Sequence, residues 1–374
     1  MPARSHIRAF ALTGLILLPS CGSDEQGSAW SYATPDASGD VTPSDAPADA
    51  DAATVDVTQD AAPFDASDEE TGSDAADAAS GASLRIAVLS DLNGSYGSTT
   101  YGTPVHEAVA ALRADIHPDI VLLTGDLVAG QQSGLDYPAM WAGFHAAVTD
   151  PLLADGIPVV VTPGNHDASA YAGYTEERAE FVAQWTEPTR IPAVTFVDAS
   201  DYPLRYSFTY RGVFFIALDA TKVGPLSTSQ RDWVTAQLDA ADGFAVKIAF
   251  GHIPIRPVAQ GVDDEVLGDD ALEASMANHE VAAYVSGHHH AYYPGVSGGL
   301  RQIAMGCLGS GPRALLGVME TSPRSLLRID VEQDAVVSID AYMGVGFGTL
   351  VERGTLPAEV NSGGQGMQRD DLAQ

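Results

Sequence analysis

The chain has 374 residues, long enough for one large domain or two ordinary ones, and 45% of its residues are hydrophobic, which is ample for a buried core. The formal net charge of −32 argues against nucleic-acid binding driven by charge, because an acidic surface without a basic stripe repels phosphates. Free nucleotides are not excluded as ligands.

Residues 1–21 have the pattern of a secretory signal peptide. Arg4 and Arg8 precede an apolar run of ten residues, which is too short to span a bilayer. Cys21 stands where cleavage would occur, and this resembles the lipobox of bacterial lipoproteins, in which that cysteine becomes the lipidated first residue. We therefore expect an exported lipoprotein anchored at the periplasmic face or the outer membrane. The alternative is an ordinary cleaved signal, a secreted protein and a chance thiol at Cys21.

Residues 22–82 differ sharply in composition from the rest of the chain. They contain fifteen Asp and Glu, no Lys or Arg, and hardly any large apolar side chain. Such a segment cannot bury enough apolar surface to offset its chain entropy. We interpret it as a disordered acidic tether.

From residue 83 to about 345, short apolar runs alternate with helical patterns, which predicts an α/β domain. Two strand runs around Arg211 and Gly212 predict a hairpin at 206–219, and 325–344 predicts two more strands. We expect residues 346–374 to form a polar tail without chemistry. The other expected strands are 84–90, 119–125, 157–164, 245–251 and 281–287, and the expected helices are 103–115, 137–150, 174–185 and 227–241.

Potential metal ligands stand in the turns after five of these apolar runs, where parallel α/β sheets place their sites. Each turn alone is weak evidence of a site, since Gly, Asp and Asn are ordinary turn residues and His252 could be a capped loop histidine. Together they form a mixed oxygen and nitrogen set that suits Mn, Fe or Zn, is too rich in nitrogen for Ca or Mg, and lacks the thiolates of a structural zinc site. The residues are Asp91, Asn93, Asp126, Asn165, His166, His252, His288, His289 and His290.

The order of these turns resembles the calcineurin-like metallophosphoesterase family, whose motifs read D-x-H, G-D, G-N-H-[ED], H and G-H-x-H. Here they read "SDLNG", "TGDLV", "PGNHD", "FGHIP" and "SGHHH", and the resemblance covers roughly residues 84–342. It implies the family's αββα sandwich, with two mixed β-sheets flanked by helices. It also implies a metal-dependent phosphoester hydrolase that acts on a small phosphoester through a hydroxide activated by two divalent or trivalent ions.

The resemblance assigns roles to individual residues. His166 would be the catalytic histidine, a non-ligand that protonates the leaving oxygen or stabilises charge; the alternative is a satisfied turn histidine. His289 would point away, because residues two apart share a face in extended chain. One metal would take Asp91, Asp126 and His290, the other Asp126, Asn165, His252 and His288, with Asp126 bridging the two.

The sequence departs from the family at Asn93, where the first motif has its second histidine. An amide oxygen is a poorer ligand than imidazole for these metals, so we expect Asn93 to be at most a weak ligand. Tyr96 could substitute for it or be a loop aromatic. The Asp and Arg that follow the second motif in protein Ser/Thr phosphatases are missing, which disfavours that subfamily.

Two alternatives to a phosphoesterase enzyme differ in strength. A metallo-β-lactamase type would need an early H-x-H-x-D-H run, which is not present. A catalytically weakened lipoprotein that keeps the fold as a surface binding module is favoured only by Asn93.

The motifs are flanked by possible substrate contacts at Tyr292, Tyr293 and Arg256. Cys307 follows a strand-like run and has no adjacent base, so we expect it to be a buried inert thiol.

Overall fold

A computed structural model describes residues 83–309 and 311–373. The predicted signal peptide, the predicted tether and Cys21 lie outside the described residues. Within the described part of the chain, the helices are all too short or too polar to cross a membrane.

The first sheet has six strands in the order β13-β12-β11-β1-β2-β3. Strands β1, β2 and β3, which lead from the middle of the sheet to one side of it, run parallel to one another. Strand β11 pairs antiparallel with β1. The sheet is therefore mixed, and it brings the carboxyl ends of β1, β2 and β3 to one edge. Its strands are β1 (Leu84–Leu89), β2 (Ile120–Leu123), β3 (Val159–Val161), β11 (Ser325–Glu332), β12 (Ala335–Met343) and β13 (Thr349–Leu350).

The second sheet has nine strands in the order β14-β15-β9-β10-β8-β7-β6-β5-β4. Strands β6, β7, β8 and β10 are parallel, and the outer pairs are antiparallel. The predicted hairpin is confirmed as β5 and β6, which turn at Arg211 and Gly212 with φ of 47° and 79°. The strands are β4 (Thr195–Asp201), β5 (Arg205–Tyr210), β6 (Val213–Ala217), β7 (Lys247–Phe250), β8 (Ala283–Ser286), β9 (Tyr293–Ser297), β10 (Leu300–Ala304), β14 (Glu359–Ser362) and β15 (Gln365–Arg369).

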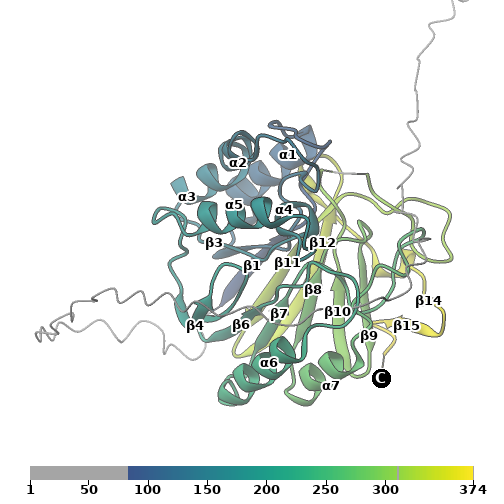
Figure 1. The fold of residues 1–374 in the computed structure, drawn as a ribbon. Helices are drawn as coiled ribbons and strands as arrows, with labels where there is room; N and C mark the ends of the chain where they lie inside the picture. The colour runs from purple at the N-terminus through teal and green to yellow at the C-terminus, as the bar shows by residue number, and fades with distance from the viewer. Residues whose placement is uncertain (1–82, 310, 374) are drawn as a thin grey trace, which may run out of the picture. The chain divides into compact units, whose positions relative to one another are not determined.

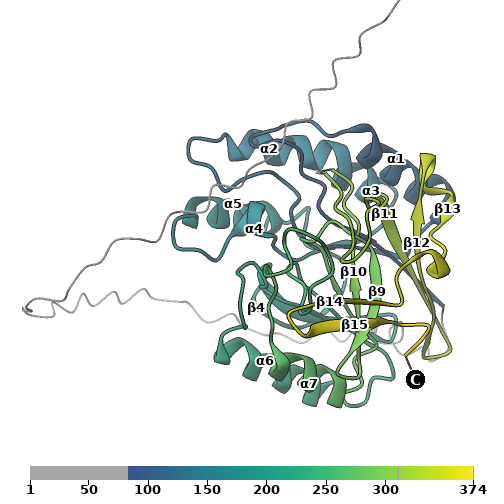
Figure 2. The ribbon, with the colours of Figure 1, turned by 90° about the vertical axis from the view of Figure 1, so that its right-hand side faces the viewer.

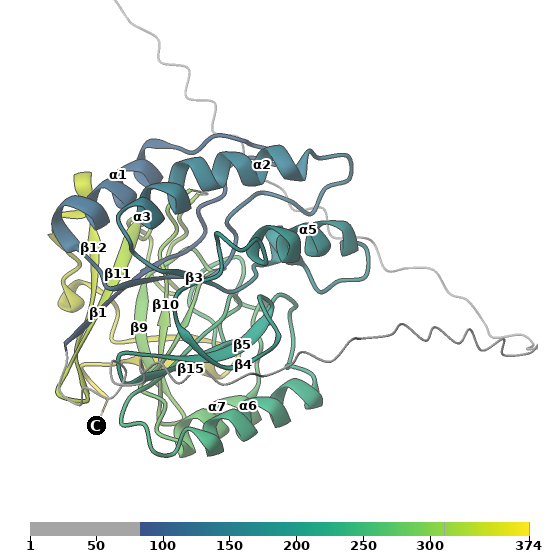
Figure 3. The same cartoon turned by 90° about the vertical axis from the view of Figure 1, so that its left-hand side faces the viewer.

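Helices cover the outer face of each sheet (Figure 1). Helices α1, α2 and α5 lie over the first sheet, as Figure 3 shows, and α6 and α7 lie over the second. The predicted α/β sandwich of two mixed sheets flanked by helices is confirmed. The helices are α1 (Thr103–Ala111), α2 (Tyr137–Phe144), α3 (Asp150–Ala154), α4 (Asn165–Ala168), α5 (Thr175–Trp185), α6 (Thr228–Ala240) and α7 (Asp270–Asn278), with π-helical turns at Leu112–Ile116 and His145–Thr149 and 3-10 turns at Val345–Phe347 and Arg353–Thr355.

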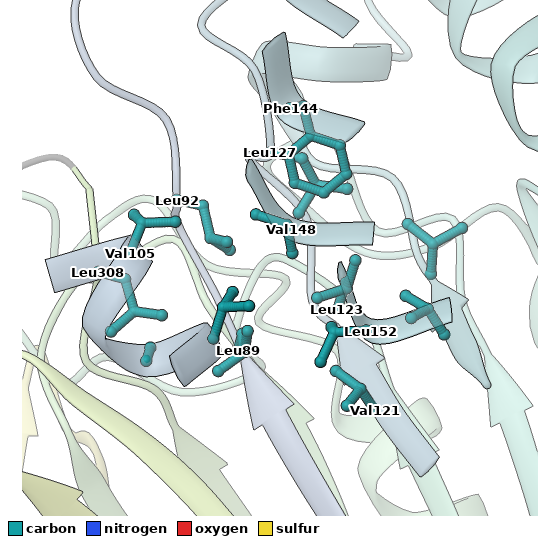
Figure 4. Packing of buried hydrophobic residues seen from close by; sticks show 14 of the residues in the cluster. Leu89, Leu92, Val105, Val121, Leu123, Leu127, Phe144, Val148, Leu152 and Leu308 are labelled. Atoms are coloured by element: carbon teal, nitrogen blue, oxygen red, sulfur yellow. The ribbon is translucent and has the colours of Figure 1, made fainter. Parts of the chain in front are cut away.

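Strand β1 shows why its sequence is apolar at nearly every position. Ile86 and Val88 pack between the two sheets, whereas Ala87 and Leu89 pack under the helices. A strand that is buried on both faces cannot alternate apolar with polar residues. Figure 4 shows the helix-side core, in which Leu89 and Leu123 of the sheet belong to one cluster with Val105 of α1 and Phe144 of α2.

The C-terminal residues correct the predicted domain boundary at 345. Residues 346–373 are not a tail: they form β13 on the first sheet and the hairpin β14–β15 on the second, beside β9 (Figure 2). Val360 and Met367 are buried against Tyr293 in a small core of their own. These strands are short and mostly polar, so no periodic apolar signal marks them.

The packing of this hairpin generates a stability prediction. Val360→Ser should lower the free energy of unfolding by roughly 1.5–3 kcal/mol, because it exchanges a buried valine for a polar side chain. Val337→Ser, at a strand valine that is 55% exposed, should cost less than about 1 kcal/mol. Urea unfolding of both variants measures the difference. Equal losses would contradict a packed C-terminal hairpin.

Candidate metal centre

The five ligand-bearing turns meet at one edge of the sandwich. Three follow β1, β2 and β3 of the first sheet, and two follow β7 and β8 of the second. Parallel strands put their carboxyl ends on the same side, so each sheet delivers its turns to a single edge. Main-chain hydrogen bonds join neighbouring turns, from Asp91 N to Gly125 O at 3.1 Å and from Gly287 N to His252 O at 2.9 Å.

Asp91, Asp126 and His290 form the first group of candidate metal ligands. One potential ligand atom from each lies within 4.8 Å of the others, and all three side chains are buried. His290 Nε2 is 3.2 Å from Asp91 Oδ1, and Ser90 Oγ donates to Asp91 Oδ2 at 2.7 Å. Burial alone would raise the pKa of Asp91, but the attraction of His290 outweighs it and lowers this pKa.

Asp126, His252 and His288 form the second group, with the same spacing between potential ligand atoms. His252 Nε2 is 3.3 Å from Asp126 Oδ1 and 2.9 Å from Asn165 Oδ1, so Asn165 adjoins this group. Burial by itself would lower the pKa of His252, but the Asp126 carboxylate raises it to about 9. His252 Nδ1 bonds Thr124 O at 2.8 Å, which fixes the ring orientation.

Asp126 is the side chain common to both groups. Its carboxylate is buried, and burial would raise its pKa, but His252 and His166 lower it far below the usual range. Asp126 Oδ1 also accepts from His166 N at 2.9 Å, which ties the turn after β2 to α4. A single carboxylate thus faces ligands delivered by both sheets.

Four of the candidate ligands have left-handed backbone conformations. The φ angles are 52° at Asp91, 54° at Asp126, 66° at His288 and 52° at His290. This region is uncommon for residues other than glycine and persists where the surroundings enforce it. The sharp turn at each strand end aims the side chain across the edge rather than away from it.

Glycine lets the turns after β2 and β3 come into backbone contact. A Cβ on Gly164 would lie 2.1 Å from Asp126 N, and one on Gly125 would lie 2.6 Å from Gly164 Cα. Asp167 links the same two turns, because its Oδ1 accepts hydrogen bonds from Asp126 N at 3.0 Å and from Gly164 N at 2.9 Å. Larger side chains would push the two turns apart.

His166, the predicted catalytic histidine, lies beside both groups without belonging to either. Its side chain is partly exposed, and its Nδ1 is 3.4 Å from Gly130 O. The ring of Tyr96 lies 5.6 Å from the His166 ring, measured between centroids, and Tyr96 is 43% exposed. The pair therefore forms an open, aromatic side of the site.

Asn93 is buried in the turn that follows Asp91. Its backbone N donates to Asp126 O at 3.0 Å, so the residue keeps its place in the turn although it departs from the family motif. The role of its side chain toward a metal stays a prediction.

The three flanking residues predicted as possible substrate contacts are buried in the protein. Tyr292 and Tyr293 belong to the cores, and Arg256 forms a buried ion pair with Glu273 and a second ion pair with the exposed Asp270. Cys307 is a buried thiol outside any disulfide, and burial raises its pKa to about 12, as expected for an inert cysteine.

His289 points away from both groups as predicted, although its neighbours His288 and His290 have left-handed φ angles rather than the extended backbone on which that prediction was based. It is fully buried: its Nδ1 accepts from Val258 N at 3.2 Å, and its Nε2 donates to Glu265 O at 3.1 Å. Burial lowers its pKa well below the usual value, so the ring is neutral and has one donor and one acceptor.

Sequence reasoning missed three residues that support the ligands. Gln131 Oε1 accepts from Asn165 Nδ2 at 3.2 Å, Glu265 Oε2 lies 2.9 Å from His288 Nε2, and Arg313 Nη1 donates to His288 O at 3.0 Å. All three are in irregular segments, where no periodicity or motif marks them.

The residues fit a pair of metal ions. Asp91 and Asp126 place two buried carboxylates close together, and buried charges normally require pairing or a cation. The mixture of carboxylate, amide and imidazole donors suits transition metals such as Mn, Fe or Zn.

Comparison with known proteins identifies the family of this chain. The family model for calcineurin-like phosphoesterases matches residues 84–292, more than half of the chain, and the chain belongs to that family. No curated protein matches the sequence.

Two solved structures show the same fold. A purple acid phosphatase, PPD1, from yellow lupin (Lupinus luteus) seeds is 15% identical with a TM-score of 0.54, and the match covers 73% of this chain and 53% of the lupin chain. The chain therefore spans about half the length of that phosphatase. GAP50, the anchor in the inner membrane complex of Plasmodium, is 15% identical with a TM-score of 0.50, covering 71% of this chain and 85% of GAP50.

The contact between the second and third turns can be tested with one methyl group. Gly164→Ala should lower the free energy of unfolding by roughly 1–3 kcal/mol and displace Asp126, because its Cβ would collide with the Asp126 main chain. Gly173→Ala is the control, since a Cβ there meets nothing within 4 Å. Denaturant unfolding and metal titration of both variants measure the effect. Wild-type behaviour of Gly164→Ala would contradict the contact.

Proposed function

We propose that this protein is a metal-dependent hydrolase of small phosphoesters that uses two metal ions. The observation that carries the proposal is the sharing of Asp126 by two groups of candidate ligands, one completed by Asp91 and His290 and the other by His252 and His288. Membership of the calcineurin-like phosphoesterase family supports phosphoester hydrolysis as the reaction class.

The chain's own residues would divide the work at this site. Asp126 would hold both cations, and Asn165 and His252 would complete the second position. When bound, the two ions would neutralise charge on the phosphoryl group and activate water for in-line attack. His166 would protonate the leaving oxygen or stabilise its charge, because its partly exposed ring stands at the side of both groups.

The alternative function is a binding module that has kept the fold with a weakened site. Asn93, which replaces the histidine of the first motif, is the observation that favours it. The fold alone does not decide, since one structural neighbour is described as a phosphatase and another as an anchor. The convergence of the other ligand positions favours the enzyme, because a decaying site has no reason to preserve them together.

We also propose that the protein is exported and tethered to a membrane through Cys21. The apolar run before Cys21 and the acidic, apolar-poor composition of residues 22–82 support this arrangement. An anchor of this kind would leave the phosphoesterase domain in the aqueous phase at the end of a tether.

The shared carboxylate provides the test of the proposed function. Asp126→Asn should reduce hydrolysis by roughly 100-fold or more and weaken both metals, because even outer partners of metal ligands contribute 10–100-fold. The assay compares an aryl phosphate monoester with the matching diester under added Mn²⁺, beside metal titration. Asp115→Asn, an exposed acid, is the control and should be unchanged. Near-normal turnover in Asp126→Asn would contradict the two-metal mechanism. If the unmodified protein neither bound metal nor hydrolysed the esters, the binding module would be favoured.

The proposed anchor has its own test. Cys21→Ser should move the protein from the membrane fraction to the soluble fraction of the exporting cell, because a serine cannot carry the lipid. Immunoblots of the two fractions measure the shift. Continued membrane fractionation of the variant would rule out anchoring through Cys21.

A further inference from the structure

The segment between β7 and α7 is attached to the middle histidine of the three. Val258 N donates to His289 Nδ1 at 3.2 Å, and His289 Nε2 donates to Glu265 O at 3.1 Å. One buried ring thus bonds the main chain at two points seven residues apart. His289 thus helps to hold this segment, and with it Glu265, in place relative to the metal ligands.

The Glu265 side chain reaches the first of the three histidines. Its Oε2 lies 2.9 Å from His288 Nε2, although the ring N–H is not aligned on it as a hydrogen bond. The Glu265 side chain is 37% exposed and that of His288 only 11%. The carboxylate therefore lies between solvent and the ring, on the outer side of the candidate ligand.

Glu265 is not itself one of the grouped ligands. Among the described residues, the group around His288 contains Asp126 and His252 but not Glu265. Since Nε2 of His288 faces the Glu265 carboxylate, the other ring nitrogen, Nδ1, is the donor left for a cation.

We propose that Glu265 is a positioning residue that orients His288 for metal binding, and that His289 holds Glu265 in place. The inference rests on the proposed function, because it assumes that His288 binds a metal. A histidine ligand generally presents its second ring nitrogen to a carboxylate or carbonyl, which fixes the ring and the tautomer and strengthens the donor. Two other candidate ligands follow this pattern: His252 Nδ1 bonds the Thr124 carbonyl oxygen, and His290 Nδ1 bonds the Gly311 carbonyl oxygen. His288 instead has the Glu265 carboxylate.

The main chain of His288 is secured separately. Arg313 donates from Nη1 to His288 O at 3.0 Å and from its backbone N to His290 O at 3.1 Å. The peptide is thus held by Arg313 while the ring contacts Glu265. Removing the Glu265 charge should loosen the ring without unfolding the turn.

The arrangement gives each of the three adjacent histidines a different task. His288 and His290 belong to different ligand groups, and His289 fixes the segment that carries the partner of His288. A substitution at His289 would therefore act on the metal site through Glu265, although the ring itself points away from the ligands.

The test uses the full chain, stripped of metal, with the isosteric variant Glu265→Gln. Titration calorimetry with Mn²⁺ should show one of two binding equivalents weakened by roughly 10–100-fold, and the other unchanged. The visible absorption of the Co²⁺-loaded variant should differ from that of the unmodified protein, because a reoriented ring changes the ligand field. Excess Mn²⁺ should restore kcat. Asp264→Asn, the exposed neighbouring acid, is the matched control and should match the unmodified protein in every measurement.

The outcomes separate this inference from the proposed function. If the unmodified protein binds two equivalents of Mn²⁺ and Glu265→Gln binds them equally well with an unchanged Co²⁺ spectrum, the positioning role is overturned and the proposed function stands. If the unmodified protein binds no Mn²⁺, both are overturned. Selective loss of one equivalent at unchanged thermal unfolding supports the role of Glu265.

Discussion

Two carboxylates, Asp91 and Asp126, are buried within reach of one another at the edge where the two sheets deliver their turns. Burying like charges this close is costly unless positive charge lies beside them. The imidazole rings of His290 and His252 lie beside them, at 3.2 Å and 3.3 Å from the two carboxylates. The demand for positive charge is the physical reason that this edge suits cations, and much of the local structure can be understood as holding the acids there.

The backbone at these acids has conformations that are uncommon for residues other than glycine. Asp91 and Asp126 have left-handed φ angles, and Gly164 packs so closely against the Asp126 main chain that a methyl group would not fit. Asp167 bridges the same turns by accepting from main-chain N–H groups on both. Hydrogen bonds from a neighbouring turn thus help to hold these uncommon backbone conformations.

Several features could be predicted from the sequence because each has a local signal. Strand β1 is apolar on both faces, the hairpin turn at Arg211 and Gly212 has a recognisable composition, and the ligand turns carry Asp or His directly after a strand. The hairpin β14–β15 could not be predicted, since Val360 and Met367 are its only buried apolar residues and its other residues are mostly polar. Glu265 was missed for a different reason. His289 holds its segment through hydrogen bonds to Val258 N and Glu265 O, and no spacing in the sequence indicates these bonds.

The two ligand groups differ in charge, and this difference gives the departure at Asn93 a physical context. The first group has two carboxylates and one imidazole, and the second has one carboxylate, two imidazoles and the neighbouring amide of Asn165. The first position therefore attracts a cation mainly through charge, whereas the second depends on the direction of neutral donors. Replacing an imidazole by Asn93 at the first position removes a neutral donor but leaves both charges. Orientation matters more at the second position, and it is there that the structure supplies Glu265 beside His288 and Gln131 beside Asn165.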